Sequence, residues 1–134
     1  MSPQVEIILR LLLATALGAG IGYQRERAGK AAGLRTHILI ALGSALFTLV
    51  SIFGFSGAVD PSRVAAGVVA GVGFIGAGVI FRGMRGEVIA GITTAASIWA
   101  TAAIGLAAGA GLYLISLIAT LIAVGVLMIP KVRG

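Results

Sequence analysis

This sequence lacks cysteine and has few charged residues. Cysteine is absent, which excludes disulfides, thiolate metal sites and a cysteine nucleophile. Only 10% of the 134 residues are charged, whereas 59% are hydrophobic, and the mean hydropathy is +1.13. So little polar surface cannot cover a water-soluble protein. The composition therefore predicts an integral membrane protein.

Candidate catalytic groups are scarce as well. The sequence holds one histidine, His37, and four carboxylates, which are Glu6, Glu26, Asp60 and Glu87. A transition-metal site would need further imidazole or thiolate ligands. The carboxylates divide two and two between the predicted sides of the membrane, so they form neither an acid–base pair nor an octahedral magnesium cage. We predict no enzyme activity, no catalytic or metal-binding residue and no cofactor.

Five apolar runs are separated by short polar interruptions. A hydrocarbon core of about 30 Å takes roughly 20 helical residues, so five crossings use nearly the whole chain. The first run lacks the basic segment of a cleavable signal and is expected to remain as a span. Asp60 is the expected N-cap of the third run, with Pro61 at the first helical position. We predict an all-α integral membrane protein, a single domain over 1–134 forming a bundle of about five transmembrane helices at approximately 5–23, 34–55, 61–81, 88–106 and 112–129.

Lysine and arginine are concentrated in alternate connections between these runs. Because basic residues in short loops favour the cytoplasmic side, we predict that the N-terminus lies outside and the C-terminus in the cytoplasm. The net charge of +6 then marks the cytoplasmic face and attracts anionic lipid, and we expect no nucleic-acid partner. The residues on this side are Arg25, Arg27, Lys30, Arg35, Arg82, Arg85, Lys131 and Arg133.

Glycine is abundant, with 21 residues, and most of them fall inside the spans. In lipid, small residues let helix backbones approach closely. The spacing predicts that the third span packs at the centre of the bundle. Packing within one chain is favoured, and a homodimer or larger homo-oligomer stays open. The predicted packing residues are Gly67, Gly71, Gly73, Gly76, Gly78, Gly105 and Gly109, with Gly18 and Gly22 spaced in the same way.

Residues 71–76 also match the dinucleotide fingerprint G-x-G-x-x-G. That motif works at a turn between a buried strand and a helix. Here it lies in the middle of a predicted span, where a phosphate would sit in hydrocarbon. We therefore expect no nucleotide there.

Charged residues at the predicted outer end need partners, because polar groups in lipid cost free energy. Glu6 and Arg10 are four residues apart on one helix face, so we expect them to pair. Asp60 and Arg63 lie at the same level. The four residues predict either an external ion-pair cluster or a shallow mouth for a charged ligand.

Hydroxyl groups recur along the fourth span. Thr93, Ser97 and Thr101 are spaced four apart, with Thr94 alongside, so this stripe should face protein. It either packs against a neighbouring helix or lines a polar path. We expect Trp99 to fill the core at mid-depth with its indole N–H bonded inside the bundle. His37 is interpreted as an interfacial residue.

Several strings in this sequence resemble, in order, the MgtC/SapB family. The combination of Arg-Glu-Arg, Gly-Leu-Arg-Thr-His and Thr-Ala-Ala-x-x-Trp is much more specific than any one string. The resemblance covers essentially the whole chain as the membrane domain of the family. The strings are YQRER at 23–27, KAAGLRTH at 30–37, DPSRVAA at 60–66, GFIGAG at 73–78 and GITTAASIW at 91–99.

The resemblance implies a multi-pass protein of the bacterial inner membrane, from a family tied to growth in low magnesium and to virulence. Members were once considered Mg²⁺ carriers. The better-supported view is that they modulate other membrane machinery, including the proton-driven ATP synthase. Many members continue into a cytoplasmic C-terminal domain, which we do not expect in this chain. Some virulence-associated members carry asparagine at the place of Thr93 and cysteine at that of Ala100, and this sequence has neither.

The leading prediction is therefore a non-enzymatic membrane protein that acts in magnesium and ion-stress adaptation by modulating membrane partners. The alternative is a small ion channel or transporter, for example of Mg²⁺, with a path between spans three and four. A basic cytoplasmic loop would hold lipid phosphates at about 1 kcal/mol per basic residue. The residues predicted to contact lipid or partner are Arg25, Glu26, Arg27, Lys30, Arg35, Thr36, His37, Asp60, Arg63, Arg82, Arg85, Thr93, Thr94, Ser97 and Trp99.

Overall fold

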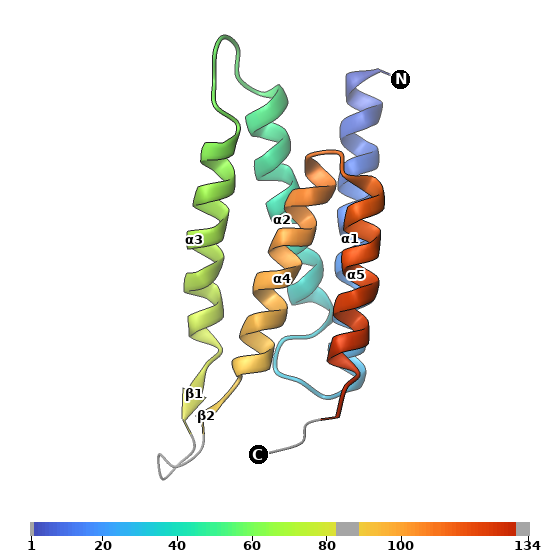
Figure 1. Cartoon of the computed structure of the whole chain (residues 1–134), viewed down its shortest axis with the longest axis vertical. Coiled ribbons are helices and arrows are strands. Elements are labelled where there is room, and N and C mark those ends of the chain that lie inside the picture. The colour runs from blue at the N-terminus through green and yellow to red at the C-terminus, as the bar shows by residue number, and fades with distance from the viewer. Residues whose placement is uncertain (1, 83–88, 131–134) are drawn as a thin grey trace.

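Five helices lie side by side, and consecutive helices run in opposite directions (Figure 1). The computed structural model describes residues 2–82 and 89–130. Two short antiparallel strands join the third helix to the fourth, with Phe81 opposite Ala90. The prediction of an all-α bundle of five helices is confirmed. The elements are α1 (Pro3–Arg27), α2 (Leu34–Phe53), α3 (Ser62–Gly78), β1 (Phe81–Arg82), β2 (Ile89–Ala90), α4 (Ile92–Gly109) and α5 (Tyr113–Leu127).

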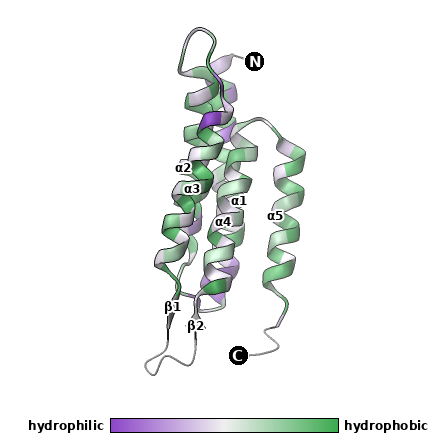
Figure 2. Ribbon diagram, turned by 60° about the vertical axis from the view of Figure 1, so that its left-hand side comes forward, coloured by the Kyte–Doolittle hydropathy of each residue, from purple (hydrophilic) through white to green (hydrophobic). Residues whose placement is uncertain are grey.

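Three of the helices, α1, α2 and α4, are long and apolar enough to cross a membrane. The other two, α3 and α5, are shorter apolar helices of 17 and 15 residues. At 1.5 Å per residue they extend over about 25 and 22 Å, somewhat less than a hydrocarbon core of about 30 Å. Hydrophobic residues cover most of each helix (Figure 2).

The loop of residues 28–33 and the two strands lie at one end of the bundle, called here the basic end (Figure 1). Arg25, Arg27, Lys30 and Arg35 belong to this end. The N-terminus, the α2–α3 loop and the α4–α5 turn lie at the opposite end. Arg85, Lys131 and Arg133 lie outside the described residues. Successive connections alternate between the two ends of the bundle, in agreement with the charge pattern. Which end faces the cytoplasm stays a prediction.

The connection between α3 and α4 is longer than predicted. α3 ends at Gly78 instead of residue 81, and α4 begins at Ile92 instead of residue 88. Gly91 has φ +91°, a left-handed conformation that favours glycine, and a Cβ there would overlap the Val79 carbonyl oxygen. This close approach lets the chain leave the strands and enter α4 at once.

The core is formed by α1, α2 and α4, which pack on one another through small residues. Ala14, Ala41 and Ala45 are fully buried. A Cβ at Gly18 would lie 2.7 Å from the His37 carbonyl oxygen, and one at Gly109 would lie 2.7 Å from that of Ala45. Backbones in such proximity require glycine. The predicted packing pairs 18/22 and 105/109 are therefore confirmed as contacts within the chain.

The prediction for the third span is wrong. α3 is a peripheral helix that packs chiefly on α4, and four of its predicted packing glycines face open space. Gly76 alone among the predicted set on α3 has a neighbour, because a Cβ there would lie 3.6 Å from the Ala95 carbonyl oxygen. The spacing of glycines identifies a helix face without side chains, but it does not identify which helix packs on that face. The four glycines at which an added Cβ would meet no atom within 4 Å are Gly67, Gly71, Gly73 and Gly78.

Candidate functional site

A group of polar side chains is buried near the basic end, between α1, α2 and α4. We call Arg25, His37, Thr94 and Ser97 the buried polar centre. Arg25 is only 2% exposed, although it lies in the last turns of α1. Its Nη2 donates to Thr94 Oγ1 at 2.8 Å, and its buried Nε has no hydrogen-bond partner in the described part of the chain.

His37 is the second member of the centre and is completely buried. Its Nδ1 lies 2.8 Å from the carbonyl oxygen of Gly33, and its Nε2 lies 2.9 Å from Ser97 Oγ. Because a carbonyl oxygen only accepts, Nδ1 carries a proton. Ser97 Oγ donates its proton to the Thr94 carbonyl oxygen at 2.7 Å.

The prediction that Arg25 lies in a surface patch that holds lipid phosphates is wrong, because its side chain is buried. His37, interpreted as an interfacial residue, is buried as well, and its depth in the membrane stays a prediction. Arg25 belongs to the face of α1 that also buries Ile21 and Gly22, so it points into the bundle instead of toward lipid phosphates. His37 lies one turn inside α2, on the face that meets α4. The available signal was helical spacing, since Arg25 follows Ile21 by four residues and continues the buried stripe.

The remaining members of the predicted basic loop behave as expected of a surface. Lys30 and Arg35 are exposed, and Thr36 is half-buried. Arg27 is exposed and donates to Tyr23 Oη at 2.8 Å, with its guanidinium 5.7 Å from that ring. Arg82 lies in β1, and its side chain is outside what the structure describes, as is Arg85.

Glu26 has a structural role that the sequence reasoning missed. Its Oε1 accepts the backbone N–H of Leu34 at 3.0 Å. That N–H belongs to the first residue of α2, whose preceding residue is a glycine without a capping side chain. A carboxylate from α1 therefore supplies the cap of the next helix and suits its positive N-terminal dipole.

The hydroxyl stripe of α4 is directed inward, with one exception. Thr94, Ser97 and Thr101 are buried, whereas Thr93 is exposed. On the facing helix, Ser44 Oγ donates to the Ala102 carbonyl oxygen at 2.6 Å. The stripe therefore packs against α1 and α2, away from α3. The prediction that it faces protein is confirmed for these three residues and wrong for Thr93.

Trp99 is 58% exposed, so the prediction that it fills the core is wrong. The buried face of α4 is taken by smaller residues such as Ile98 and Ala102. A helix packed through alanine and glycine has no room for an indole on its inner side, which places Trp99 on the outer face.

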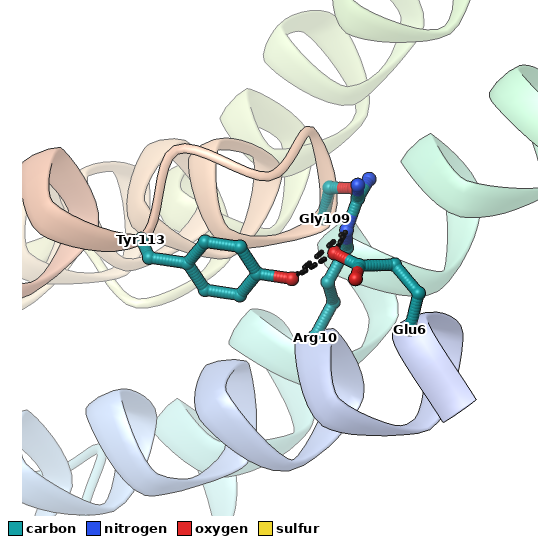
Figure 3. Close-up of polar contacts among 4 residues, drawn as sticks. All are labelled: Glu6, Arg10, Gly109 and Tyr113. Carbon is teal, nitrogen blue, oxygen red and sulfur yellow. Dashed lines mark hydrogen bonds and ion pairs between the residues drawn. The ribbon is translucent and has the colours of Figure 1, made fainter. Parts of the chain in front are cut away.

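At the opposite end, Arg10 holds α1, α4 and α5 together in a polar cluster, called here the outer clamp (Figure 3). Its Nε donates to Glu6 Oε2 at 2.8 Å, and its Nη1 donates to the Gly109 carbonyl oxygen at 3.0 Å. Tyr113 Oη donates to Glu6 Oε2 and also lies 3.4 Å from Arg10 Nε. The guanidinium stacks 5.5 Å from the Phe53 ring. A cation is favourable here because α4 ends at Gly109.

The outer clamp confirms the Glu6–Arg10 pair and corrects the predicted four-residue cluster. Asp60 accepts hydrogen bonds from the Ser62 hydroxyl at 2.7 Å and from its backbone N–H at 3.0 Å. These bonds lower the pKa of the Asp60 carboxyl. Arg63 is exposed, and in the described residues neither it nor Asp60 forms an ion pair. Tyr113, which the sequence reasoning did not single out, takes their place.

Two cavities open on the sides of the bundle. The larger, about 590 Å³, is a groove between α2 and α3 with an almost wholly apolar lining that includes Gly43, Gly67 and Gly71. The smaller, about 280 Å³, lies between α4, α5 and Ile21 of α1, and we call it the lateral crevice. Among residues 2–82 and 89–130, no three His, Cys, Asp or Glu side chains gather as a metal site would require.

Comparison with known proteins identifies relatives over most of the chain. YhiD of Escherichia coli K12, a proposed magnesium transporter, is 54% identical over 81% of this chain and 53% of its own length. SapB of Bacillus subtilis is 46% identical over 81% of this chain and 49% of its own. MgtC of Brucella abortus is 44% identical over 87% and 49%, respectively. The chain thus spans about half the length of these relatives.

No solved structure matches the chain. The model of the MgtC family matches residues 11–132, which include all of α2, α3, α4 and α5 and most of α1. The five-helix fold, the apolar spans and the relatives that match most of the chain all support the same family assignment. The chain belongs to the MgtC family.

Proposed function

We propose that this protein serves magnesium and ion-stress adaptation in a bacterial inner membrane, as a non-enzymatic protein that modulates membrane partners. The link to magnesium rests on its relative YhiD, the proposed magnesium transporter. One observation supports this mode of action. The helices of the bundle interior are packed in close contact, whereas one face of α3 and the outer face of α4 are not covered by another helix.

The closed interior argues for a modulator over a conducting pore. A Cβ at Gly105 would lie 2.9 Å from the Ala41 carbonyl carbon, so α2 and α4 touch backbone to backbone. The buried hydroxyls donate to backbone carbonyls or meet the buried polar centre. A path between α3 and α4 would need those hydroxyls on the opposite side of α4.

The open side has the properties of a helix-binding surface. Gly67 and Gly71 leave the α3 backbone accessible, and such faces support close helix association in lipid. Trp99 presents an indole N–H on the outer face of α4, where hydrocarbon offers no acceptor. A partner helix could supply one. Family resemblance suggests the ATP synthase as partner, and a second copy of this chain is the other candidate.

Anionic lipid is the further partner that we propose, at the exposed bases of the basic end. Arg27, Lys30 and Arg35 are exposed there. Each such residue near an anionic surface contributes about 1 kcal/mol. The charge pattern that orients the chain also favours a cytoplasmic position for this end.

Cross-linking in native membranes tests the proposed contact surface. Because the chain has no cysteine, single-cysteine variants carry one reactive site each. Gly71→Cys places the thiol on the open face of α3, and Leu114→Cys places a control on α5, where the native side chain is 66% exposed. We expect a discrete cross-linked species from the first variant and none from the second. Equal or absent cross-linking in both would contradict the proposal.

The alternative function, a magnesium channel or transporter, is favoured by the description of YhiD. Proteoliposomes loaded with a Mg²⁺ indicator separate the two functions. We expect no flux above that of protein-free vesicles. Robust Mg²⁺ flux that disappears in a Thr93→Val, Ser97→Ala double variant would replace the modulator proposal with a transporter.

A further inference from the structure

His37 and Arg25 are held by the same turn of α4, although they come from two other helices. His37 Nε2 lies 2.9 Å from Ser97 Oγ, and Arg25 Nη2 donates to Thr94 Oγ1 at 2.8 Å. Both side chains are almost completely buried. Histidine is the side chain that gains or loses a charge near neutral pH. A group that can become positive is therefore packed close to a permanent cation.

The hydrogen bonds around His37 suit a protonated ring. Nδ1–H donates to the Gly33 carbonyl oxygen, which only accepts. Ser97 Oγ gives its one proton to the Thr94 carbonyl oxygen, so it offers a lone pair to the ring. Nε2 completes this arrangement when it carries a proton of its own. When the ring is neutral, the Ser97 hydroxyl turns and donates to Nε2 instead, so one hydroxyl rotation accommodates the second proton.

Among the described side chains, Arg25 is the charged group whose field acts on His37. Glu26, the next residue of α1, is bonded to the first backbone N–H of α2. Arg35 of α2 is exposed, α4 contains no titratable residue, and Arg63 of α3 lies at the opposite end of the bundle. A proton on the imidazole therefore faces a like charge, and the described residues bring no carboxylate to balance it.

The contact between α1 and α2 leaves no space for water around a second cation. A Cβ at Gly18 would lie 2.7 Å from the His37 carbonyl oxygen, and one at Gly22 would lie 2.8 Å from the Cα of Leu34. The two backbones thus touch at the turn that carries the imidazole. Two like charges in such a dry site repel each other and lack the water that would solvate them. Separation of α1 from α2 relieves both costs.

We propose that His37 is a proton-binding site that loosens the basic end of the bundle in acid. The proton adds to Nε2, Ser97 keeps its own proton on the Thr94 carbonyl oxygen, and the new cation faces Arg25. α1 then separates from α2 beside the loop of residues 28–33. The proton comes from water at the basic end, because His37 lies only one turn inside α2 and Ser97 lines the lateral crevice.

NMR of the imidazole tests proton uptake directly, since His37 is the only histidine in the sequence. Wild-type protein with isotope-labelled histidine, purified in micelles without a polyhistidine tag, is titrated from about pH 8 to about pH 4, a range that brackets the ordinary imidazole value. We expect one reversible titration that ends with both ring nitrogens protonated. A ring that stays neutral over the whole range would overturn the site, and this result requires no variant to fold.

Unfolding by SDS in mixed micelles at several pH values tests the loosening. Uptake of one proton changes the unfolding equilibrium constant by at most about 10-fold per pH unit. For the wild type we expect this constant to rise by about 10-fold between about pH 7 and about pH 5, and for His37→Gln by less than about twofold. The same pH dependence in both proteins, or a wild type that gains stability in acid, would overturn the proposal.

Two arginine variants test the role of the facing charge. Arg25→Gln removes that charge and should reduce the acid-induced rise, whereas Arg27→Gln removes an equal charge at an exposed position and should preserve it. An equal effect of the two substitutions would overturn the proposed repulsion. All of these measurements use the protein without a partner, so their failure leaves the proposed function standing.

Discussion

Gly105→Ala tests the central packing contact of the bundle. A Cβ at this position would lie 2.9 Å from both the Cα and the carbonyl carbon of Ala41, with the carbonyl oxygen closer still. Ordinary contact begins at 3.4 Å, so α2 and α4 must separate by about 0.5 Å or more. Overpacking of this kind costs up to about 3 kcal/mol, and the better helix propensity of alanine returns at most about 1 kcal/mol. We expect a net loss of about 2 kcal/mol.

Unfolding in mixed micelles by added SDS measures this loss, and the single tryptophan, on α4 itself, reports the transition. Gly67→Ala is the matched control, because a Cβ there has no neighbour within 4 Å. It should leave the free energy of unfolding unchanged or raise it by less than about 1 kcal/mol. If Gly105→Ala is as stable as Gly67→Ala, the backbone contact between α2 and α4 is not as close as described.

Three further changes have defined outcomes. Glu26→Gln weakens the cap of α2, so the free energy of unfolding should fall by about 1 kcal/mol, whereas Arg35→Gln, an exposed change in the same region, should leave it unaltered. Arg10→Met removes the centre of the outer clamp and should lower the unfolding midpoint more than Tyr113→Phe does. The reason is that the methionine variant also leaves the Gly109 carbonyl without its hydrogen-bond donor. A larger effect of Tyr113→Phe would contradict the described geometry of the clamp. Hydrogen bonds from Ser62 lower the pKa of the Asp60 carboxyl. Their contribution to the free energy of unfolding is therefore fully present above the ordinary carboxyl pKa of about 3.9, and it is lost as the pH falls through the lowered pKa. Ser62→Ala should therefore raise the pKa of Asp60 measured by NMR, and an unchanged value would refute the assignment.

The sequence predicted the number of helices and their approximate bounds because each helix is an apolar run between polar interruptions. Glu6 and Arg10 were also predictable, since a pair four residues apart meets on any helix. Gly105 and Gly109 were predicted as packing positions from their spacing. These features are local, and they need no knowledge of which helices are neighbours.

The arrangement of the helices was not predictable in the same way. Gly67 and Gly71 have the same spacing as Gly105 and Gly109, yet only the second pair meets another backbone. The burial of Arg25 depends on α4 bringing Thr94 to the right level. Trp99 is displaced outward because alanines already fill the inner face. Each outcome depends on contacts between residues far apart in sequence, which a spacing rule does not contain.

The bonds of the outer clamp form in a defined order during synthesis of the chain. Arg10 and Gly109 are separated by 99 positions, and Tyr113 follows later still. While the first helices enter the membrane, Glu6 is therefore the one polar group of the clamp that is available to the Arg10 guanidinium. Its remaining bonds form when the end of α4 and the start of α5 are in place. The clamp is thus complete only when the end of α4 and the start of α5 are present, and a ribosome-bound chain that stops short of residue 109 has not yet reached its native connectivity.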